Sequence, residues 1–309
     1  MKNKSKSWIS AARRFFGTEA FLGLLLLLSL NGRAQNLFVA DGYNSEIYEY
    51  TPGGVQTTFA SGLSHPVGLA FNNAGDLFEA DDGSGNIYEF TPGGVRTTFA
   101  SGLVLPYSLA FDSFGNLFVG TYGGQAQIIK ITPSGVKSTF ASGLSYAVGL
   151  AFNSAGDLFE SDMGSEQIFE FTPGGVKSTY ANGNFQPTGL AFDSAGNLFI
   201  GDALNKCIYE VDPSFNVTTI ASGVKLPLGL AFDNTGNLFA SEILGNDIIE
   251  ITSGGTQNIF ASGSFVPYGI AFEPQTVPEC STLGLLGFGL CALFVWQRRF
   301  GDGLSKSPN

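Results

Sequence analysis

The sequence is poor in the residues that build most catalytic and metal centres. It has one histidine and three cysteines in 309 residues. Cys280 and Cys291 lie near the C-terminus, so Cys207 is alone in the middle of the chain, and neither an internal disulfide framework nor a cysteine-rich zinc site can form there. A Ser-His-Asp set would need His65, a loop histidine next to proline, and no nucleophile motif is present. Catalysis is therefore disfavoured.

Basic residues are also scarce between Gln35 and Thr276. This segment holds 6 of the 15 Lys and Arg residues but 23 of the 26 Asp and Glu residues, a formal charge of −17 against −11 for the whole chain. Such a surface repels phosphate backbones, so we expect no nucleic-acid partner. It favours cations, basic partners or simple solubility.

Segments with helical periodicity are missing from this part of the chain as well. In their place a unit of 40 residues, once 41, recurs with copies that begin at Asn36, Asp76, Asn116, Asp157, Asn197 and Asn237. A fixed period near 40 with several short strand signals is typical of a propeller blade. We therefore predict one domain over residues 35–276, and we expect it to be a monomer.

Each copy predicts four strands. In the second copy these are Leu77–Ala80, Ile87–Phe90, Val95–Ala100 and Ser108–Phe111, each bounded by glycine, proline or aspartate turn signals. The phenylalanines recur at two strand positions, which places them in the packing between blades. The predicted fold is an all-β, six-bladed propeller of four-stranded blades.

The repeats are offset from the blades in a way that predicts how the ring closes. The first copy begins with its Leu-Phe strand, the counterpart of Leu77–Ala80, and the sixth ends just after the inner strand Pro267–Phe272. If this last inner strand pairs with the N-terminal strands of Asn36–Ala60, one blade is built from both ends of the chain. That pairing would remove two open sheet edges.

The repeats resemble those of the NHL-repeat and SMP-30/gluconolactonase-like propellers. The shared pattern is P-x-G-L-A-F followed by G-N/D-L-F-x-A-D, and the resemblance covers roughly residues 36–273. It stands at Pro66–Phe71 with Gly75–Asp81, at Pro187–Phe192 with Gly196–Asp202, and at Pro227–Phe232 with Gly236–Glu242. The resemblance implies the fold, but hydrolases, lyases and binding modules all use it.

Residues 1–34 have the pattern of a secretory signal peptide. Lysines and arginines precede the apolar run Phe21–Leu30, and small residues stand before a cleavage point after Ala34. The alternative is an uncleaved N-terminal anchor. Either way, we expect the repeats to be exported through the inner membrane.

Residues 277–309 resemble the PEP-CTERM sorting signal that an exosortase-type enzyme processes. A polar motif leads into an apolar segment over residues 283–296, which basic residues follow, although Cys280 replaces the usual second proline. The motif and stop residues are Val277, Pro278, Glu279, Ser281, Thr282, Arg298 and Arg299. A plain membrane anchor is the alternative. Both place the repeats at the cell envelope, or secreted after the tail is cut.

Acidic residues recur at the end of the Leu-Phe strand, the strand at Leu77–Ala80 in the second copy. They are Asp41, Asp81, Asp162, Asp202 and Glu242, with Asp82 beside one of them and Thr121 in the remaining copy. Repetition favours a structural role in which each accepts backbone N–H bonds of the next turn. The alternative is cation binding of the kind Ca²⁺ prefers.

The residues just before the inner-strand glycines should surround the axis. They are Val67, Tyr107, Val148, Thr188, Leu228 and Tyr268. The resemblance implies that a lactonase would hold a metal with carboxylates and amides at this mouth, and these residues are poor ligands for one. A mouth lined by Tyr107, Tyr268, Leu228 and Val67 suits a sugar or peptide, although tyrosines serve equally well in packing.

The function predicted from the sequence is therefore an exported, envelope-sorted binding or scaffold module, with exopolysaccharide or a protein as ligand and no required cofactor. The alternatives are a metal-dependent lactonase or hydrolase and a Ca²⁺-stabilised structural protein.

Overall fold

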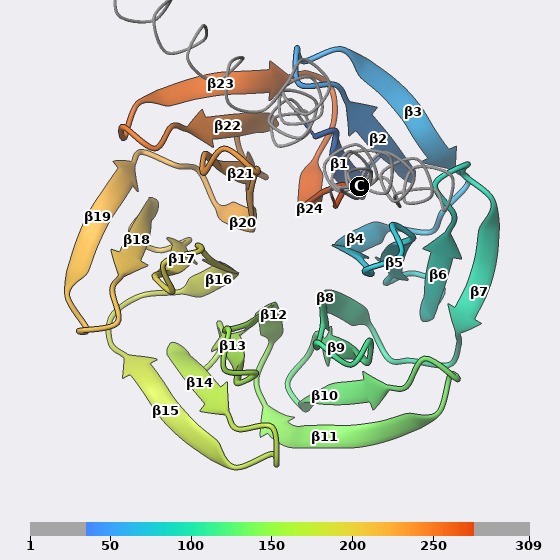
Figure 1. Cartoon of the computed structure of the whole chain (residues 1–309), viewed down its shortest axis with the longest axis horizontal. Helices are drawn as coiled ribbons and strands as arrows, with labels where there is room; N and C mark the ends of the chain where they lie inside the picture. The colour runs from blue at the N-terminus through green and yellow to red at the C-terminus, as the bar shows by residue number, and fades with distance from the viewer. Residues whose placement is uncertain (1–34, 275–309) are drawn as a thin grey trace, which may run out of the picture. The chain divides into compact units, whose positions relative to one another are not determined.

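The computed structural model describes residues 35–274, in which six four-stranded antiparallel sheets surround an axis (Figure 1). This confirms the predicted six-bladed, all-β propeller. The segments interpreted as a signal peptide and as a sorting signal, including residues 283–296, lie outside the described residues. Within residues 35–274 no helix is long and apolar enough to cross a membrane.

The strands form four concentric sets. The inner strands are β4 (Pro66–Phe71), β8 (Pro106–Phe111), β12 (Ala147–Phe152), β16 (Pro187–Phe192), β20 (Pro227–Phe232) and β24 (Pro267–Phe272). The second strands are β1 (Leu37–Asp41), β5 (Leu77–Asp81), β9 (Leu117–Thr121), β13 (Leu158–Asp162), β17 (Leu198–Asp202) and β21 (Leu238–Glu242).

The third strands are β2 (Glu46–Tyr50), β6 (Asn86–Phe90), β10 (Ala126–Ile131), β14 (Gln167–Phe171), β18 (Cys207–Val211) and β22 (Asp247–Ile251). The outer strands are β3 (Gln56–Ser61), β7 (Arg96–Ala100), β11 (Lys137–Leu144), β15 (Lys177–Asn182), β19 (Val217–Ser222) and β23 (Gln257–Ser262). Blade 1 is β24-β1-β2-β3, and blades 2 to 6 follow in chain order from β4.

Blade 1 closes the ring with strands from both ends of the described chain, as predicted. The C-terminal strand β24 pairs antiparallel with β1, from Leu37 opposite Phe272 to Asp41 opposite Pro267. The two strands lie side by side in Figure 1, orange-red against blue. Backbone and side-chain bonds extend the contact, since Glu273 N–H donates to the Asn36 carbonyl at 3.1 Å and Val266 N–H donates to Asp41 Oδ1 at 3.1 Å.

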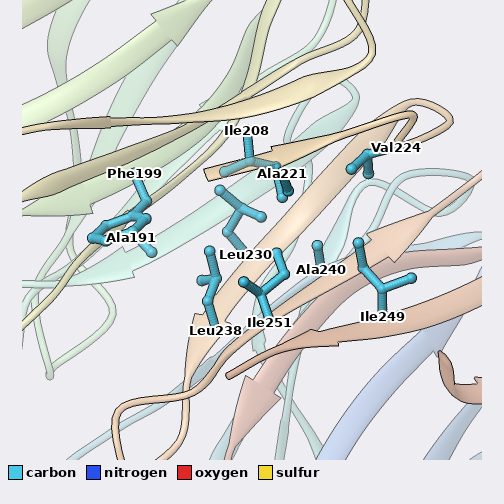
Figure 2. Packing of buried hydrophobic residues seen from close by; sticks show 10 residues of the cluster. All are labelled: Ala191, Phe199, Ile208, Ala221, Val224, Leu230, Leu238, Ala240, Ile249 and Ile251. Atoms are coloured by element: carbon cyan, nitrogen blue, oxygen red, sulfur yellow. The ribbon is translucent and has the colours of Figure 1, made fainter. Parts of the chain in front are cut away.

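The core lies between neighbouring blades. Each second strand contributes one nearly fully buried phenylalanine, which packs edge-on against the phenylalanine at the end of an inner strand; Phe199 and Phe232 are one such pair, with ring centroids 4.8 Å apart. Figure 2 shows the junction of blades 5 and 6, where Phe199, Leu238 and Ile251 belong to one buried cluster. Burying such a side chain contributes about 1.5–3 kcal/mol, so these six junctions are the main source of stability.

The inner strands pack against each other with almost no space between them. A Cβ added at Gly68 would collide with the Tyr107 carbonyl of the next inner strand, which explains the glycine in this strand. Hydroxyl groups tie several junctions together: Ser241 donates to the Tyr268 carbonyl at 2.6 Å and Ser108 to the Ala147 carbonyl at 3.1 Å. The axial part of the ring is therefore rigidly specified.

Two of the second strands carry a buried carboxyl group at a position that is apolar in the other blades. Glu79 and Glu160 are fully buried, and neither oxygen of either side chain has a hydrogen-bond partner. The third residue of the second strand is apolar in the other blades, for example Ile200. Burial raises the pKa of both carboxyls well above the ordinary value, and the neighbouring Asp81 or Asp162 raises it further.

We predict that Glu160→Ile stabilises the protein by roughly 1–3 kcal/mol, because it removes an unsatisfied buried polar group. The raised pKa of Glu160 means that the folded chain holds this proton more tightly than the unfolded chain. The free energy of unfolding of the wild type therefore falls as pH rises above the ordinary pKa range of glutamate. The difference in this free energy between the variant and the wild type should grow from about pH 5 to about pH 8.

Urea unfolding of both proteins at the two pH values measures this difference. Ile200→Val, at the equivalent strand position, serves as the control and should show a small change that is the same at both values. An advantage of Glu160→Ile that shrinks as pH rises would contradict the assignment of a protonated, buried carboxyl.

Candidate ligand-binding site

The two ends of the propeller differ in the segments they present. At one end, here called the mouth face, each second strand ends and the chain enters each inner strand. At the other end, the turn face, the third strands turn into the outer strands through sequences such as Thr91-Pro92-Gly93-Gly94. The residues predicted to line the axis belong to the mouth face.

The recurring acids lie beneath the surface of the mouth face. Four of them, Asp41, Asp81, Asp162 and Asp202, accept backbone N–H bonds of 2.6–3.1 Å from two segments. One segment is the turn that follows the acid, and the other is the loop that leads into the inner strand of the same blade. The Glu242 carboxylate accepts Lys225 N–H at 3.2 Å, and Thr121 Oγ1 accepts Gln127 N–H at 2.9 Å. This geometry is that of the turn-capping interpretation.

The axis is a narrow channel of about 80 Å³. Its wall is formed by the inner strands, and Val67, Tyr107 and Leu228 are among its lining residues. Val67 and Leu228 are buried in this wall, whereas Tyr107 is half-buried. A sugar or peptide needs several hundred Å³, so a ligand would lie across the mouth and not inside the channel.

Three tyrosines form a continuous aromatic run at the mouth. Tyr107 stacks on Tyr122 with centroids 4.9 Å apart, and Tyr122 contacts Tyr146 at 4.7 Å. Tyr122 directly follows β9 and Tyr146 directly precedes β12, so the run crosses from blade 3 to blade 4. All three rings are half-buried, which leaves one aromatic surface open to a ligand.

Tyr268 extends the aromatic surface to the closure blade. Its ring lies edge-on to His65 at 5.0 Å. Gly42 makes this placement possible, because a Cβ there would come within 2.6 Å of the Tyr268 ring and 3.0 Å of His65 Nε2. The five other blades have a residue with a Cβ at the position of Gly42, namely Asp82, Tyr122, Met163, Ala203 and Ile243.

His65 and Asp82 form the polar part of the mouth. His65 Nδ1 lies 3.3 Å from Asp82 Oδ2, and the two side chains are 40% and 22% exposed. Yet His65 Nδ1 and the other Asp82 oxygen are buried atoms without a hydrogen bond. Asp82, predicted as a turn cap or cation ligand, therefore pairs with histidine at the mouth. Buried polar atoms left without a hydrogen bond are unusual in proteins.

The mouth tyrosines are held as neutral phenols. Burial raises the pKa of Tyr107, Tyr122 and Tyr268, and the negative charge of Asp82 adds to the increase in each case. Their hydroxyls are thus donors as well as acceptors at neutral pH. The mouth combines aromatic faces, phenol hydroxyls and one carboxylate.

Sequence reasoning found Tyr107 and Tyr268 but missed Tyr122, Tyr146 and the pairing of His65 with Asp82. A signal was present, because these four residues occupy two other repeated positions: the residue after the second strand and the residue before the inner strand. Comparing the six copies at those positions would have shown that aromatic and charged residues gather in blades 2 to 4.

The donor groups at this mouth do not suit the axial metal of a lactonase. The axial positions carry apolar residues, tyrosine or threonine, and in residues 35–274 no three His, Cys, Asp or Glu side chains converge as a metal site requires. Most of the acids that could bind Ca²⁺ already accept two or more N–H bonds. No metal-dependent step can be assigned to these residues.

The solved structures most useful for comparison share the fold at low identity. A chain of a nidogen/laminin complex has a TM-score of 0.71 at 19% identity, covering 78% of this chain and 99% of that one. A putative gluconolactonase gives 0.62 at 17%, covering 76% and 88%. Virginiamycin B lyase from Staphylococcus aureus gives 0.53 at 20%, covering 66% and 73%.

The structures that share this propeller fold therefore include a chain of a nidogen/laminin complex, a putative gluconolactonase and a lyase. At such identities they establish the fold alone. No protein-family model matches the chain, and no curated protein matches it.

We predict that dialysed protein retains well under one equivalent of divalent metal, because the candidate oxygens are engaged in turn bonds. Elemental mass spectrometry of the full-length chain measures this, and a chelator should leave the melting temperature unchanged. About one tightly held equivalent, or a clear loss of stability on chelation, would contradict the turn-capping assignment.

Proposed function

We propose that this protein is an exported binding module of the cell envelope that holds a neutral glycan across the mouth of its propeller. The observation that carries the proposal is the aromatic surface of Tyr107, Tyr122 and Tyr146, with Tyr268 and His65 as a second aromatic pair at the same mouth. Aromatic faces pack against the apolar faces of sugar rings, and nearby hydroxyl and carboxylate groups bind sugar hydroxyls.

The charge of the mouth selects among glycans. Asp82 lies in the mouth, and residues 35–276 carry a formal charge of −17. An anionic polysaccharide would be repelled. Neutral oligosaccharides therefore fit better than uronate-rich or sulfated ones. The partly exposed side chains of His65 and Asp82 add polar groups to the mouth that can bind sugar hydroxyls.

The location rests on the ends of the sequence. The charged and apolar pattern of residues 1–34 supports export, and Val277-Pro278-Glu279 with Ser281-Thr282 supports sorting by an exosortase-type enzyme. In this proposal the segment 283–296 holds the chain in the membrane until the tail is processed. The acidic propeller then faces the surface polymer.

We predict that Tyr122→Ala and Tyr146→Ala each weaken glycan binding about tenfold or more, since each removes a stacking surface of roughly 1–3 kcal/mol. The measurement is calorimetric titration of the full-length chain with cellotetraose, maltotetraose and N-acetylchitotetraose. Wild type should bind at least one of the three. Neither variant should change the unfolding midpoint enough to explain the loss.

Phe215→Gly is the matched control for these variants. Phe215 is an aromatic residue, 67% exposed, in a turn of the opposite face, where other blades have glycine in the same conformation. Its removal should leave glycan binding unchanged. If Phe215→Gly weakens binding as much as Tyr122→Ala, or if none of the neutral glycans binds, the proposal is wrong.

A second candidate is a lactonase or related hydrolase or lyase. It is favoured by the pairing of His65 with Asp82, which is a general acid–base arrangement at the mouth of a fold that also occurs in lyases and a putative gluconolactonase. A retained equivalent of metal, or turnover of simple lactones that is lost in His65→Ala, would favour this candidate over the binding module.

A further inference from the structure

A pocket on the turn face lies between blades 5 and 6. It has a volume of about 560 Å³. Its apolar lining includes Phe199, Phe232 and Ile220, and its polar lining includes Asp193, Glu210 and Asp233. Phe199 also belongs to the buried cluster drawn in Figure 2, where Leu238 and Ile251 of blade 6 lie below it in the view. The pocket is thus an aromatic and aliphatic cleft with three carboxylates and no basic side chain among its lining residues.

The same cleft recurs between blades 3 and 4, with a volume of about 510 Å³. Phe118, Asp112 and Phe152 occupy the places of Phe199, Asp193 and Phe232, because each pair stands at the same position of the repeat. This second cleft contains a cation of its own. Lys130 Nζ lies 3.8 Å from Asp112 Oδ2 and 5.2 Å from the centre of the Phe118 ring.

Lys130 therefore demonstrates what this cleft can bind. Its ammonium group contacts a carboxylate and an aromatic ring at the same time, which combines an ion pair with a cation–π contact. It reaches both from β10, where it stands directly opposite Phe118 in the strand pairing. The acid and the ring are the groups that recur in the cleft between blades 5 and 6.

The cleft between blades 5 and 6 has the recognition groups but not the lysine. Glu210 stands opposite Phe199 in the strand pairing, in the place of Lys130. Asp233 replaces Asn153, and Ile220 replaces Phe140. The first two changes turn a lining with one acid and one base into a lining with three acids, and the smaller Ile220 side chain accompanies the larger volume.

The carboxylates of this cleft are not equally engaged. Asp193 and Asp233 accept N–H bonds of their own turns, for example from Asn197 and Asn237 at 2.8 Å. The side chain of Glu210 has no hydrogen-bond or ion-pair partner among the described residues, whereas the side chains of its counterparts Glu49 and Glu250 each accept a bond from an asparagine, at 2.6 and 3.1 Å. Glu210 is therefore the group free to receive a cation.

We propose that the cleft between blades 5 and 6 binds a lysine or arginine side chain from a basic segment of a protein partner. The aliphatic stem lies against Phe199, Phe232 and Ile220. The charged end lies beside Asp193, the counterpart of the Asp112 that Lys130 contacts, and pairs with Glu210, which stands where Lys130 stands in the other cleft. A free inorganic cation would gain nothing from the apolar floor, so the shape and chemistry select a long cationic side chain. This site is on the face opposite the mouth and does not depend on the proposed glycan function.

The test is titration of a fluorescent (Ala-Lys)5 peptide with the full-length chain at low and physiological salt. We expect Glu210→Lys to weaken binding about tenfold or more, because the new lysine occupies the cleft as Lys130 does in its own blade. The variant should fold, since blade 3 carries lysine at this position. Glycan binding at the mouth should be unaffected, which separates this test from that of the proposed function.

Two variants control for the overall charge. Glu166→Lys changes the charge by the same amount in a mouth-face turn where blade 5 has Lys206 in the same conformation, so it should bind the peptide as wild type does. Lys130→Glu should empty the cleft of blades 3 and 4 and raise the number of peptides bound. If Glu166→Lys and Glu210→Lys weaken binding equally, or wild type does not bind the peptide, the proposed site is refuted.

Discussion

The pairing of β24 with β1 is the contact on which the rest of the structure depends. This pairing closes six repeats into a ring. Among the described residues, the inner strand β24 has no other strands of its own copy after it, and β1 to β3 have no inner strand before them. Their pairing gives every one of the six sheets four strands. It also completes the candidate site. Tyr268 comes from β24, more than 200 residues along the chain from Gly42 and His65, and only closure brings their side chains together. Stability and binding geometry thus rest on the same interface.

The six blades share what the ring needs and differ where ligands could bind. The buried phenylalanines and the acids that fix the mouth loops repeat around the axis, since every junction must satisfy the same packing and the same backbone donors. Departures from the repeat carry the candidate chemistry. Tyr122 and Asp82 replace small or apolar residues at the mouth, and Glu210 and Lys130 exchange charge at equivalent clefts of the turn face. A symmetric scaffold therefore presents two asymmetric faces.

Much of the fold could be predicted from the sequence. The same four strand patterns recur in six copies, and the position at which the first copy begins predicts that the two ends of the ring pair in one blade. The second strands begin one residue after each predicted repeat start, as at Leu77 and Leu198. The site was predicted only in part, since following one repeated position found Tyr107 and Tyr268 but not the neighbours that stack on them. Glu79 and Glu160 were missed for a different reason: strand alternation places them on a buried face, yet only packing reveals that no partner reaches them. The clefts between blades depend on side-chain packing across a junction, which no single repeat contains.

The central claim is that a ring closed by β24 presents one aromatic mouth that binds a neutral glycan. Fluorotyrosine incorporated into the full-length chain, with resonances assigned through single Tyr→Phe variants, tests it most directly by ¹⁹F NMR during titration with the neutral tetrasaccharides. The account predicts that, of the 10 tyrosines, the signals of Tyr107, Tyr122, Tyr146 and Tyr268 shift together with one affinity, while those such as Tyr180 on the turn face stay in place. Shifts confined to tyrosines away from the mouth, or no shift with any of these glycans, would contradict it.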